Sequence, residues 1–85
     1  GARENGDMME KEADVVLDAR DLEPPEPMVR TLEALDTLAR SEKLLVLLPR
    51  EPYPLYRALE LNGFAWQTER RPDGTVAVLI RHQTP

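Results

Sequence analysis

Two clusters of proline constrain the fold of this chain more than any other feature of its sequence. They hold six of its eight prolines: Pro24, Pro25, Pro27, Pro49, Pro52 and Pro54. Proline fixes φ and has no backbone N–H, so neither cluster can continue a strand or lie inside a helix. A loop that runs into the first turn of a helix accepts proline at no cost. The clusters therefore predict two loop-to-helix junctions.

The segments around these junctions have the periodicities of strands and helices. Short β-branched or apolar runs predict strands at 14–18 and 43–48, and the second run, KLLVLL, is typical of a central strand buried on both faces. Apolar residues spaced i, i+4, i+7 and i+11 from Met28 predict a helix that ends near Arg40. A shorter helix follows from about Pro54.

The last third of the chain predicts a hairpin. Gly63 stands where a left-handed C-terminal helix cap is needed, and Pro72-Asp73-Gly74 is a typical turn sequence between predicted strands at 64–71 and 75–81. The predicted order is β-α-β-α-β-β. Right-handed crossovers then give an α+β fold, a two-layer α/β sandwich with both helices on one face of a mixed four-stranded sheet.

Residues 13–83 are predicted to form one domain, and residues 1–12 a mobile N-terminal tail, because the tail holds only Ala2, Met8 and Met9 as apolar residues. The net charge of −5 opposes binding to nucleic acid or to an anionic membrane. The longest apolar run, Leu44 to Leu48, is too short to span a membrane.

The chain contains no cysteine, which excludes disulfides, thiolate metal sites and a cysteine nucleophile within it, and fits a cytoplasmic location. His82 is the single histidine, so no zinc site of the usual kind is predicted. No spacing brings two carboxylates uniquely together. We therefore expect no catalytic residue, no metal and no cofactor.

The sheet face without helices is one candidate functional surface. The central strand offers leucines to both faces, so an apolar patch is predicted on the open one. Its candidate interface residues are Leu45, Leu47 and Leu79. Such a patch would bind a protein partner or a second copy of the chain. The alternative is that Ala77 and the stems of neighbouring long side chains cover it.

The second candidate is a cleft between the two proline loops, which should be neighbours if both helices run the same way. The candidate ligand-binding residues are Arg20, Glu26, Arg50, Glu51, Tyr53 and Tyr56. Helix N-termini and arginines favour a small anionic ligand, although the prolines remove several N–H groups. The alternative is a charge network in which arginine and glutamate side chains hold the two loops together.

The first proline loop resembles that of a known fold. Residues Leu17 to Met28 resemble the opening of the TusA-like (SirA-like) sulfur-carrier fold, Leu-Asp-x-x-Gly-Leu-x-Cys-Pro-x-Pro, which has the same element order. Pro24 stands at the position of the carrier cysteine and Asp21 at the glycine. Sulfur transfer through a cysteine is therefore excluded for this chain.

The sequence is similar to the uncharacterised family called domain of unknown function 2249. The residues that carry the similarity are Leu22 to Met28, Arg50 to Leu55, and Gly63, Phe64 and Trp66. The resemblance implies a cysteine-free TusA-like domain. It also implies a small non-catalytic accessory module for protein interaction or ligand binding, associated with redox or nitrogen-oxide metabolism. The alternative is a component of an enzyme pathway that binds an anionic or sulfur-containing metabolite.

Overall fold

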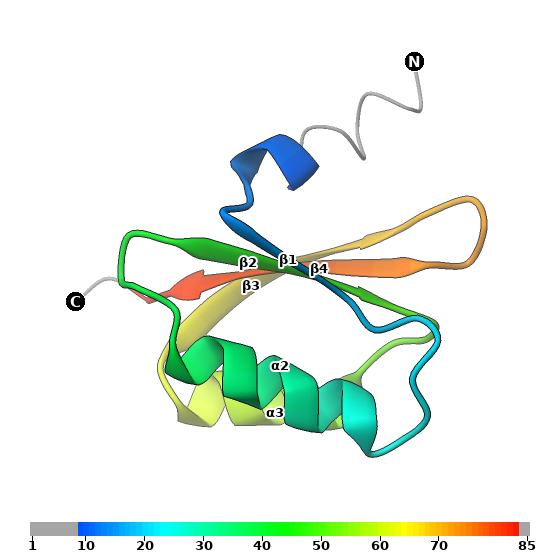
Figure 1. Cartoon of the computed structure of the whole chain (residues 1–85), viewed down its shortest axis with the longest axis horizontal. Coiled ribbons are helices and arrows are strands. Elements are labelled where there is room, and N and C mark those ends of the chain that lie inside the picture. Colours follow the sequence, from blue (N-terminus) through cyan, green and yellow to red (C-terminus); the bar gives the residue numbers. More distant parts are fainter. Residues whose placement is uncertain (1–8, 84–85) are drawn as a thin grey trace.

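The structure, a computed structural model, describes residues 9–83. Its elements are β1 (Val15–Asp18), α2 (Glu26–Asp36), β2 (Lys43–Leu48), α3 (Tyr53–Leu61), β3 (Phe64–Arg70) and β4 (Val76–His82). The predicted order is confirmed (Figure 1). The first long helix ends at Asp36 and not near Arg40, because Leu38 turns back into the core, where 7% of it is exposed.

The four strands form one mixed sheet in the order β1-β2-β4-β3. β1 and β2 are parallel, and the other two pairs are antiparallel. β2 therefore has a neighbour on each side, as its unbroken apolar run predicts. A parallel pair joined by a helix and closed by a hairpin agrees with the right-handed crossover rule used to predict the fold.

Helices α2 and α3 cover one face of this sheet (Figure 1). The alternate residues of β2 and β4 that point to this face are almost inaccessible to solvent, and they join buried leucines of both helices in the main core. The strand residues are Leu44, Val46, Leu48, Val76, Val78 and Ile80. Trp66 packs against this core and is partly buried.

The opposite face of the sheet, here called the far face, is covered as well. Residues 9–12 are helical and lie across it (Figure 1). Met9 packs with Leu45, Leu47, Ala77 and Leu79 in a second buried cluster. The prediction of a mobile tail is therefore wrong for residues 9–12, because Met9 finds an apolar surface to bury itself on; residues 1–8 lie outside the described part of the chain.

Both glycines of the described chain have positive φ, Gly63 at +78° and Gly74 at +91°. Gly63 follows the C-cap Asn62 of α3, so the predicted left-handed helix cap is present. Gly74 closes the turn between β3 and β4, where only glycine adopts such a φ without strain. Between residues 9 and 83, no helix is long and apolar enough to cross a membrane.

Candidate functional site

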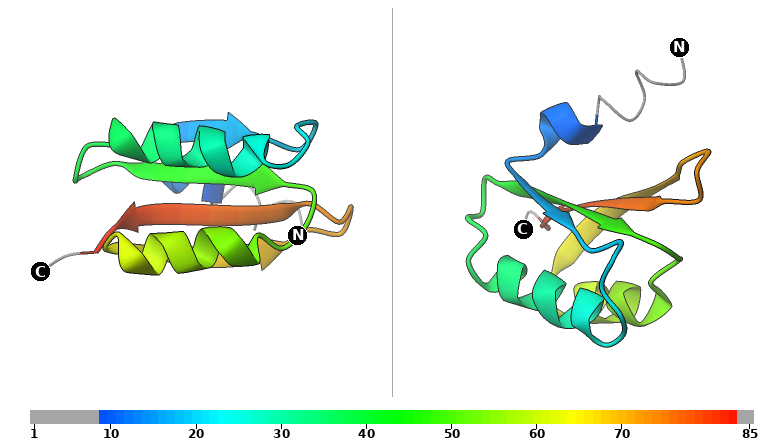
Figure 2. Two further views of the ribbon diagram at one scale, coloured as in Figure 1. Left: turned by 90° about the horizontal axis from the view of Figure 1, so that it is seen from below. Right: turned by 45° about the vertical axis from the view of Figure 1, so that its right-hand side comes forward.

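The two proline loops lie at one edge of the sheet. β1 and β2 are parallel neighbours, with Asp18 paired to Leu47 near their carboxyl ends, so the loops that leave them start at the same edge (Figure 2). The helices begin directly after the loops, with Pro25 and Pro52 as their N-cap residues. Both helix N-termini thus lie at the carboxyl ends of the parallel strands, where α/β sheets commonly bind ligands.

An open cleft of about 610 Å³ lies between these loops. Ten of its fifteen lining residues are apolar: the six clustered prolines together with Leu22, Met28, Leu48 and Leu55. The other five are charged: Arg20, Asp21, Glu23, Arg50 and Glu51. The structure therefore has a cleft where the proline loops were expected to meet, and most of its wall is apolar.

The helix N-termini offer few N–H groups to this cleft. The second residues of the helices, Pro27 and Pro54, have none, and the amides of Leu55 and Tyr56 donate to the Pro52 carbonyl at 3.0 and 3.1 Å. A phosphate cradle uses several free N–H groups in a row. The backbone at this cleft therefore does not provide one, in agreement with the prolines' predicted effect.

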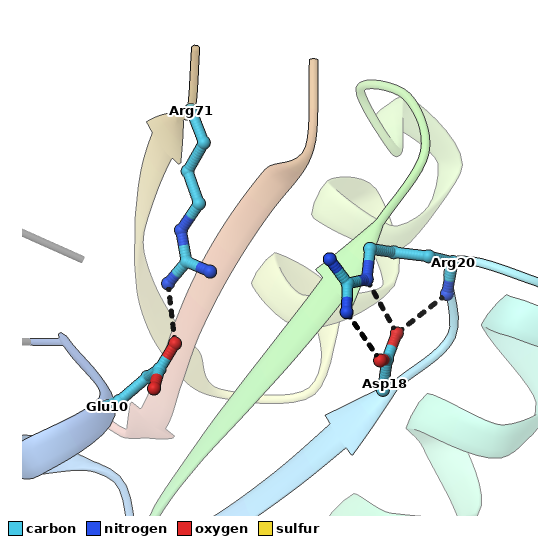
Figure 3. A network of polar contacts seen from close by, with 4 residues as sticks. All are labelled: Glu10, Asp18, Arg20 and Arg71. Atoms are coloured by element: carbon cyan, nitrogen blue, oxygen red, sulfur yellow. Dashed lines mark hydrogen bonds and ion pairs between the residues drawn. The ribbon is translucent and has the colours of Figure 1, made fainter. Parts of the chain in front are cut away.

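Arg20 is neutralised by a carboxylate of the preceding strand. Its Nε and Nη2 donate to the two Asp18 oxygens at 2.9 and 2.7 Å, and its backbone N–H donates to Oδ1 at 3.2 Å (Figure 3). These bonds to the side chain and then to the backbone of Arg20 lower the pKa of Asp18 to about 2. Arg20 is thus held against β1, and Asp18 largely neutralises its charge.

Arg50 is the second cation of the cleft. It is exposed, and it forms no ion pair with any residue from 9 to 83. The same holds for Asp21 and Glu23 on the other loop. Arg50 is therefore the guanidinium that can bind an anionic group in the cleft without first breaking a salt bridge.

Glu51 is bound by side chains of α3 and β3. It accepts a hydrogen bond from the Tyr56 hydroxyl at 2.6 Å and forms an ion pair with Arg70 at 2.6 Å. Both partners, Tyr56 first, lower the pKa of Glu51. The Tyr56 hydroxyl also contacts the Thr68 hydroxyl at 2.7 Å, and its ring stacks on Trp66 at 5.4 Å. Glu51 therefore fastens the second loop to β3.

Tyr56 should resist ionisation. Burial, followed by the bond to Glu51, raises its pKa to about 12, from an ordinary value of about 10. The stability that comes from the neutral phenol is therefore fully present below pH ~10 and is lost as the pH rises toward ~12. In the variant Tyr53→Phe, Tyr56 is the single tyrosine, so absorbance of tyrosinate should report a midpoint near 12.

The control for this titration is Glu51→Gln in the same background. It removes the carboxylate but keeps the side-chain volume, so the midpoint should fall toward 10 without reaching it, since burial is the larger cause. A midpoint close to 10 in the Tyr53→Phe protein, with an unchanged circular dichroism spectrum, contradicts both the burial of Tyr56 and its bond to Glu51.

The structure brings three of the six candidate ligand residues to the cleft and leaves three outside it. Arg20, Arg50 and Glu51 line the cleft. Glu26 instead pairs with Arg30 at 3.2 Å along α2. The two tyrosines are not among the lining residues. Tyr56 turns to the sheet, and the ring of Tyr53 packs edge-on against the ring of Tyr56, with 6.1 Å between their centroids. The charge network between the loops, the alternative reading of this cleft, is wrong, because Arg20, Glu26 and Glu51 pair with Asp18, Arg30 and Arg70, while Arg50 forms no ion pair with residues 9–83.

The three interface candidates are buried, with 0% of Leu45, 6% of Leu47 and 4% of Leu79 exposed. The expectation of an exposed apolar patch is therefore wrong, because Met9 and Ala13 pack against these side chains. Met9 and Ala13 come from the N-terminal segment, and Ala77, which the alternative reading of the sequence named, belongs to the same buried cluster.

His82 lies at the end of β4 and is half-buried. Its Nε2 donates to the Leu38 carbonyl at 2.9 Å, and its ring packs against Phe64. It therefore holds the end of β4 to the segment after α2. No group of three or more histidine, aspartate or glutamate side chains with the geometry of a metal site occurs among residues 9–83.

Sequence reasoning missed several partners of the candidate residues. Asp18 and Arg20 are two residues apart, a spacing that puts both on one side of an extended chain and could have indicated their pair. Arg70 and Met9 could not have been found in this way, because both reach their contacts, to Glu51 and to the far face, only through the folding of segments distant in sequence.

Comparison with solved structures supports the fold. The crystal structure of a SirA-like protein from Desulfitobacterium hafniense matches 82% of this chain and 99% of its own chain, with a TM-score of 0.73 and 22% sequence identity. At that identity the match establishes a shared fold only. No curated protein sequence matches the chain.

Comparison with protein families gives a match over nearly the whole described domain. Residues 16–82 match the family described as "Uncharacterized conserved protein (DUF2249)". This range includes both proline loops, both helices and all four strands except the first residue of β1. The chain therefore belongs to the DUF2249 family, as its proline loops and its SirA-like fold indicate.

Proposed function

We propose that this domain is a non-catalytic accessory module that binds a small ligand in the cleft between its proline loops. The observation that carries the proposal is the cleft itself, about 610 Å³ with a mostly apolar wall and one guanidinium, that of Arg50, which forms no ion pair with residues 9–83. Small-molecule sites commonly have volumes of about 300–1,000 Å³ and combine an apolar wall with a few polar groups. Prolines stiffen both loops, which lowers the entropy lost on binding.

The charges of the cleft select the class of ligand. Arg50 suits a carboxylate, which a guanidinium binds through two parallel hydrogen bonds. Asp21 and Glu23 face the same cleft and disfavour a ligand with several negative charges, and the prolines leave few N–H groups for phosphate. The proposed ligand therefore has an apolar body and one carboxylate.

The lining residues also support a binding role over an enzymatic one. Within the described chain, the cleft wall contains no serine, threonine, cysteine, histidine, lysine or tyrosine, so its candidate nucleophiles and proton carriers are the carboxylates of Asp21, Glu23 and Glu51. Glu51 is held ionised by Tyr56 and Arg70. Cysteine-based sulfur transfer has no reacting atom in this chain. The proposed association with redox or nitrogen-oxide metabolism, in the cytoplasm, rests on the family resemblance.

Arg50→Ala is expected to weaken binding of small apolar carboxylates at least about tenfold, because charge-assisted pairs contribute roughly 1.5–3 kcal/mol. The measurement is a ¹⁵N-NMR titration of the full chain with hexanoate and benzoate. Chemical-shift changes should gather at Leu22, Leu48 and Leu55. Hexyl phosphate should bind more weakly than hexanoate.

The matched control is Arg40→Ala, which removes an exposed arginine from the segment after α2, outside the cleft. It should leave carboxylate binding unchanged. Equal affinities in the wild type and in Arg50→Ala, or shift changes that spread away from the cleft, would falsify the proposal.

A further inference from the structure

The far face has an apolar centre and a basic rim. Its centre is the second buried cluster, formed by β2 and β4. The sheet register places Lys43, directly opposite Arg81, on this same face, and Arg71 follows β3 beside it. In a chain of net charge −5, three basic side chains thus lie around an apolar strip, with Glu69 of β3 beside Arg71 on the same face.

The N-terminal segment matches this surface in chemistry. Met9 enters the apolar centre, where 9% of it is exposed, while Glu10 pairs with Arg71 at 3.2 Å and Glu12 pairs with Lys43 at 3.4 Å. Figure 3 shows the first of these pairs between the N-terminal helix and the end of β3. An apolar side chain with acidic neighbours is therefore what the far face accepts.

The fit of this segment is incomplete. The Arg71 Nε and the Glu69 Oε1, 3.8 Å apart, are buried and have no hydrogen-bond partner in the described part of the chain. Val16, which shares the face with Leu45, remains 53% exposed. Arg81 is exposed and forms no ion pair with residues 9–83. A longer acidic helix could therefore make contacts that residues 9–13 do not make, with the Arg71 Nε, Val16 and Arg81.

The segment is also attached in a way that permits release. Asp14 anchors it, since the Asp14 N–H donates to the Lys43 carbonyl at 2.9 Å and Asp14 Oδ2 accepts from the Lys43 N–H at 2.8 Å. Beyond this anchor, residues 9–13 contact the rest of the described chain through the packing of Met9 and Ala13 and through the two ion pairs, whose acidic side chains are 48% and 47% exposed. Exposed pairs of this kind bind weakly and are screened by salt.

We propose that the far face is a binding surface for a short acidic amphipathic helix of a partner protein, and that residues 9–13 occupy it as an intramolecular ligand. A partner helix that presents methionine or leucine with glutamates one and three residues later would displace the segment. This surface lies on the opposite side of the sheet from α2 and α3 and is independent of the proline-loop cleft.

The test uses a fluorescein-labelled peptide of residues 1–14 as the probe and the full chain as the receptor. The variant Met9→Asp/Glu10→Lys should release its own N-terminal segment from the far face. It should therefore bind the peptide at least about tenfold more tightly than the wild type, because the peptide can bind only those wild-type molecules whose segment has left the far face. A peptide carrying Met9→Asp should not bind. In a second series, Lys43→Glu is added to the Met9→Asp/Glu10→Lys receptor. This change should weaken binding of the peptide, and a peptide that carries Glu12→Lys should restore the affinity.

Three outcomes would overturn the proposal. The first is absence of binding by the released variant while its circular dichroism spectrum remains that of a folded protein. The second is binding that is indifferent to both the Met9 and the Lys43–Glu12 changes. The third is a concentration-dependent dimer of the wild type by sedimentation, because exchange of segments between two copies would make a second copy the occupant. If the released variant does not fold, ¹⁵N-NMR of the wild type with excess peptide decides: shifts at Leu45 and Leu79 support the proposal, and their absence overturns it.

Discussion

Leu44→Asp is expected to leave no folded protein, whereas Leu47→Asp is expected to leave a folded domain whose N-terminal segment is released. Both residues lie on β2 but point to opposite faces, with 0% of Leu44 and 6% of Leu47 exposed. A buried carboxylate without a partner costs several kcal/mol or must be neutralised. What differs between the two positions is the route by which that carboxylate can reach water.

At position 44 the route requires the helices to leave the sheet, because Leu44 belongs to the main core beneath α2 and α3. That is unfolding, in a domain whose total stability is about 5–15 kcal/mol. At position 47 the carboxylate reaches water when residues 9–13 leave the far face. The cost is then the lost burial of Leu47 and Met9, at about 1.5–3 kcal/mol each, together with the partial exposure of Leu45 and Leu79, which pack with Met9.

Far-UV circular dichroism at low temperature distinguishes the two variants, and limited trypsin digestion locates the change. Cleavage at Lys11 should become faster in Leu47→Asp than in the wild type, and the remaining domain should persist. If Leu47→Asp is as unfolded as Leu44→Asp, the N-terminal segment is an integral part of the core and cannot act as a displaceable ligand.

Leu59→Ala is expected to destabilise the domain by about 2–5 kcal/mol, the usual cost of removing a fully buried leucine side chain. Leu59 is 0% exposed and packs in the main core, while Leu61 on the same helix is 73% exposed. For a domain of this size the loss corresponds to a fall in Tm of roughly 10–30 °C. Leu61→Ala should shift Tm by a few degrees at most.

Thermal unfolding of both variants, followed by circular dichroism, tests this expectation. The comparison keeps the chemical change and the helix the same and alters only burial. If the two variants melt within a few degrees of each other, α3 does not pack on the sheet as described, and the position of its N-terminus beside the cleft loses its support.

The element order and the central position of β2 could be predicted because they depend on local signals. The unbroken run from Lys43 to Leu48 matches a strand with two buried faces, and Gly63 ends a helix through its own positive φ. Proline also acts locally, because it fixes its own φ and has no N–H. The two loop-to-helix junctions were therefore predicted close to where the structure has them.

The candidate site was predicted less completely, because side-chain partners depend on contacts between distant segments. The cleft between the proline loops follows from topology alone, since parallel neighbouring strands release their loops at one edge. The direction of Tyr56 does not, because it depends on Trp66 and Thr68 of a strand that comes later in the chain.

By itself the sequence determined the β-α-β-α-β-β order, the absence of cysteine chemistry and the two stiff loops, since each depends on residue type and spacing within a few positions. Only the tertiary structure decided that Arg20 is neutralised by Asp18 while Arg50 is not, and that Met9 covers the far face. The physical reason is that burial and ion pairing belong to surfaces that meet when the chain folds. Those surfaces join residues as far apart as Glu10 and Arg71, and no local pattern records their contact.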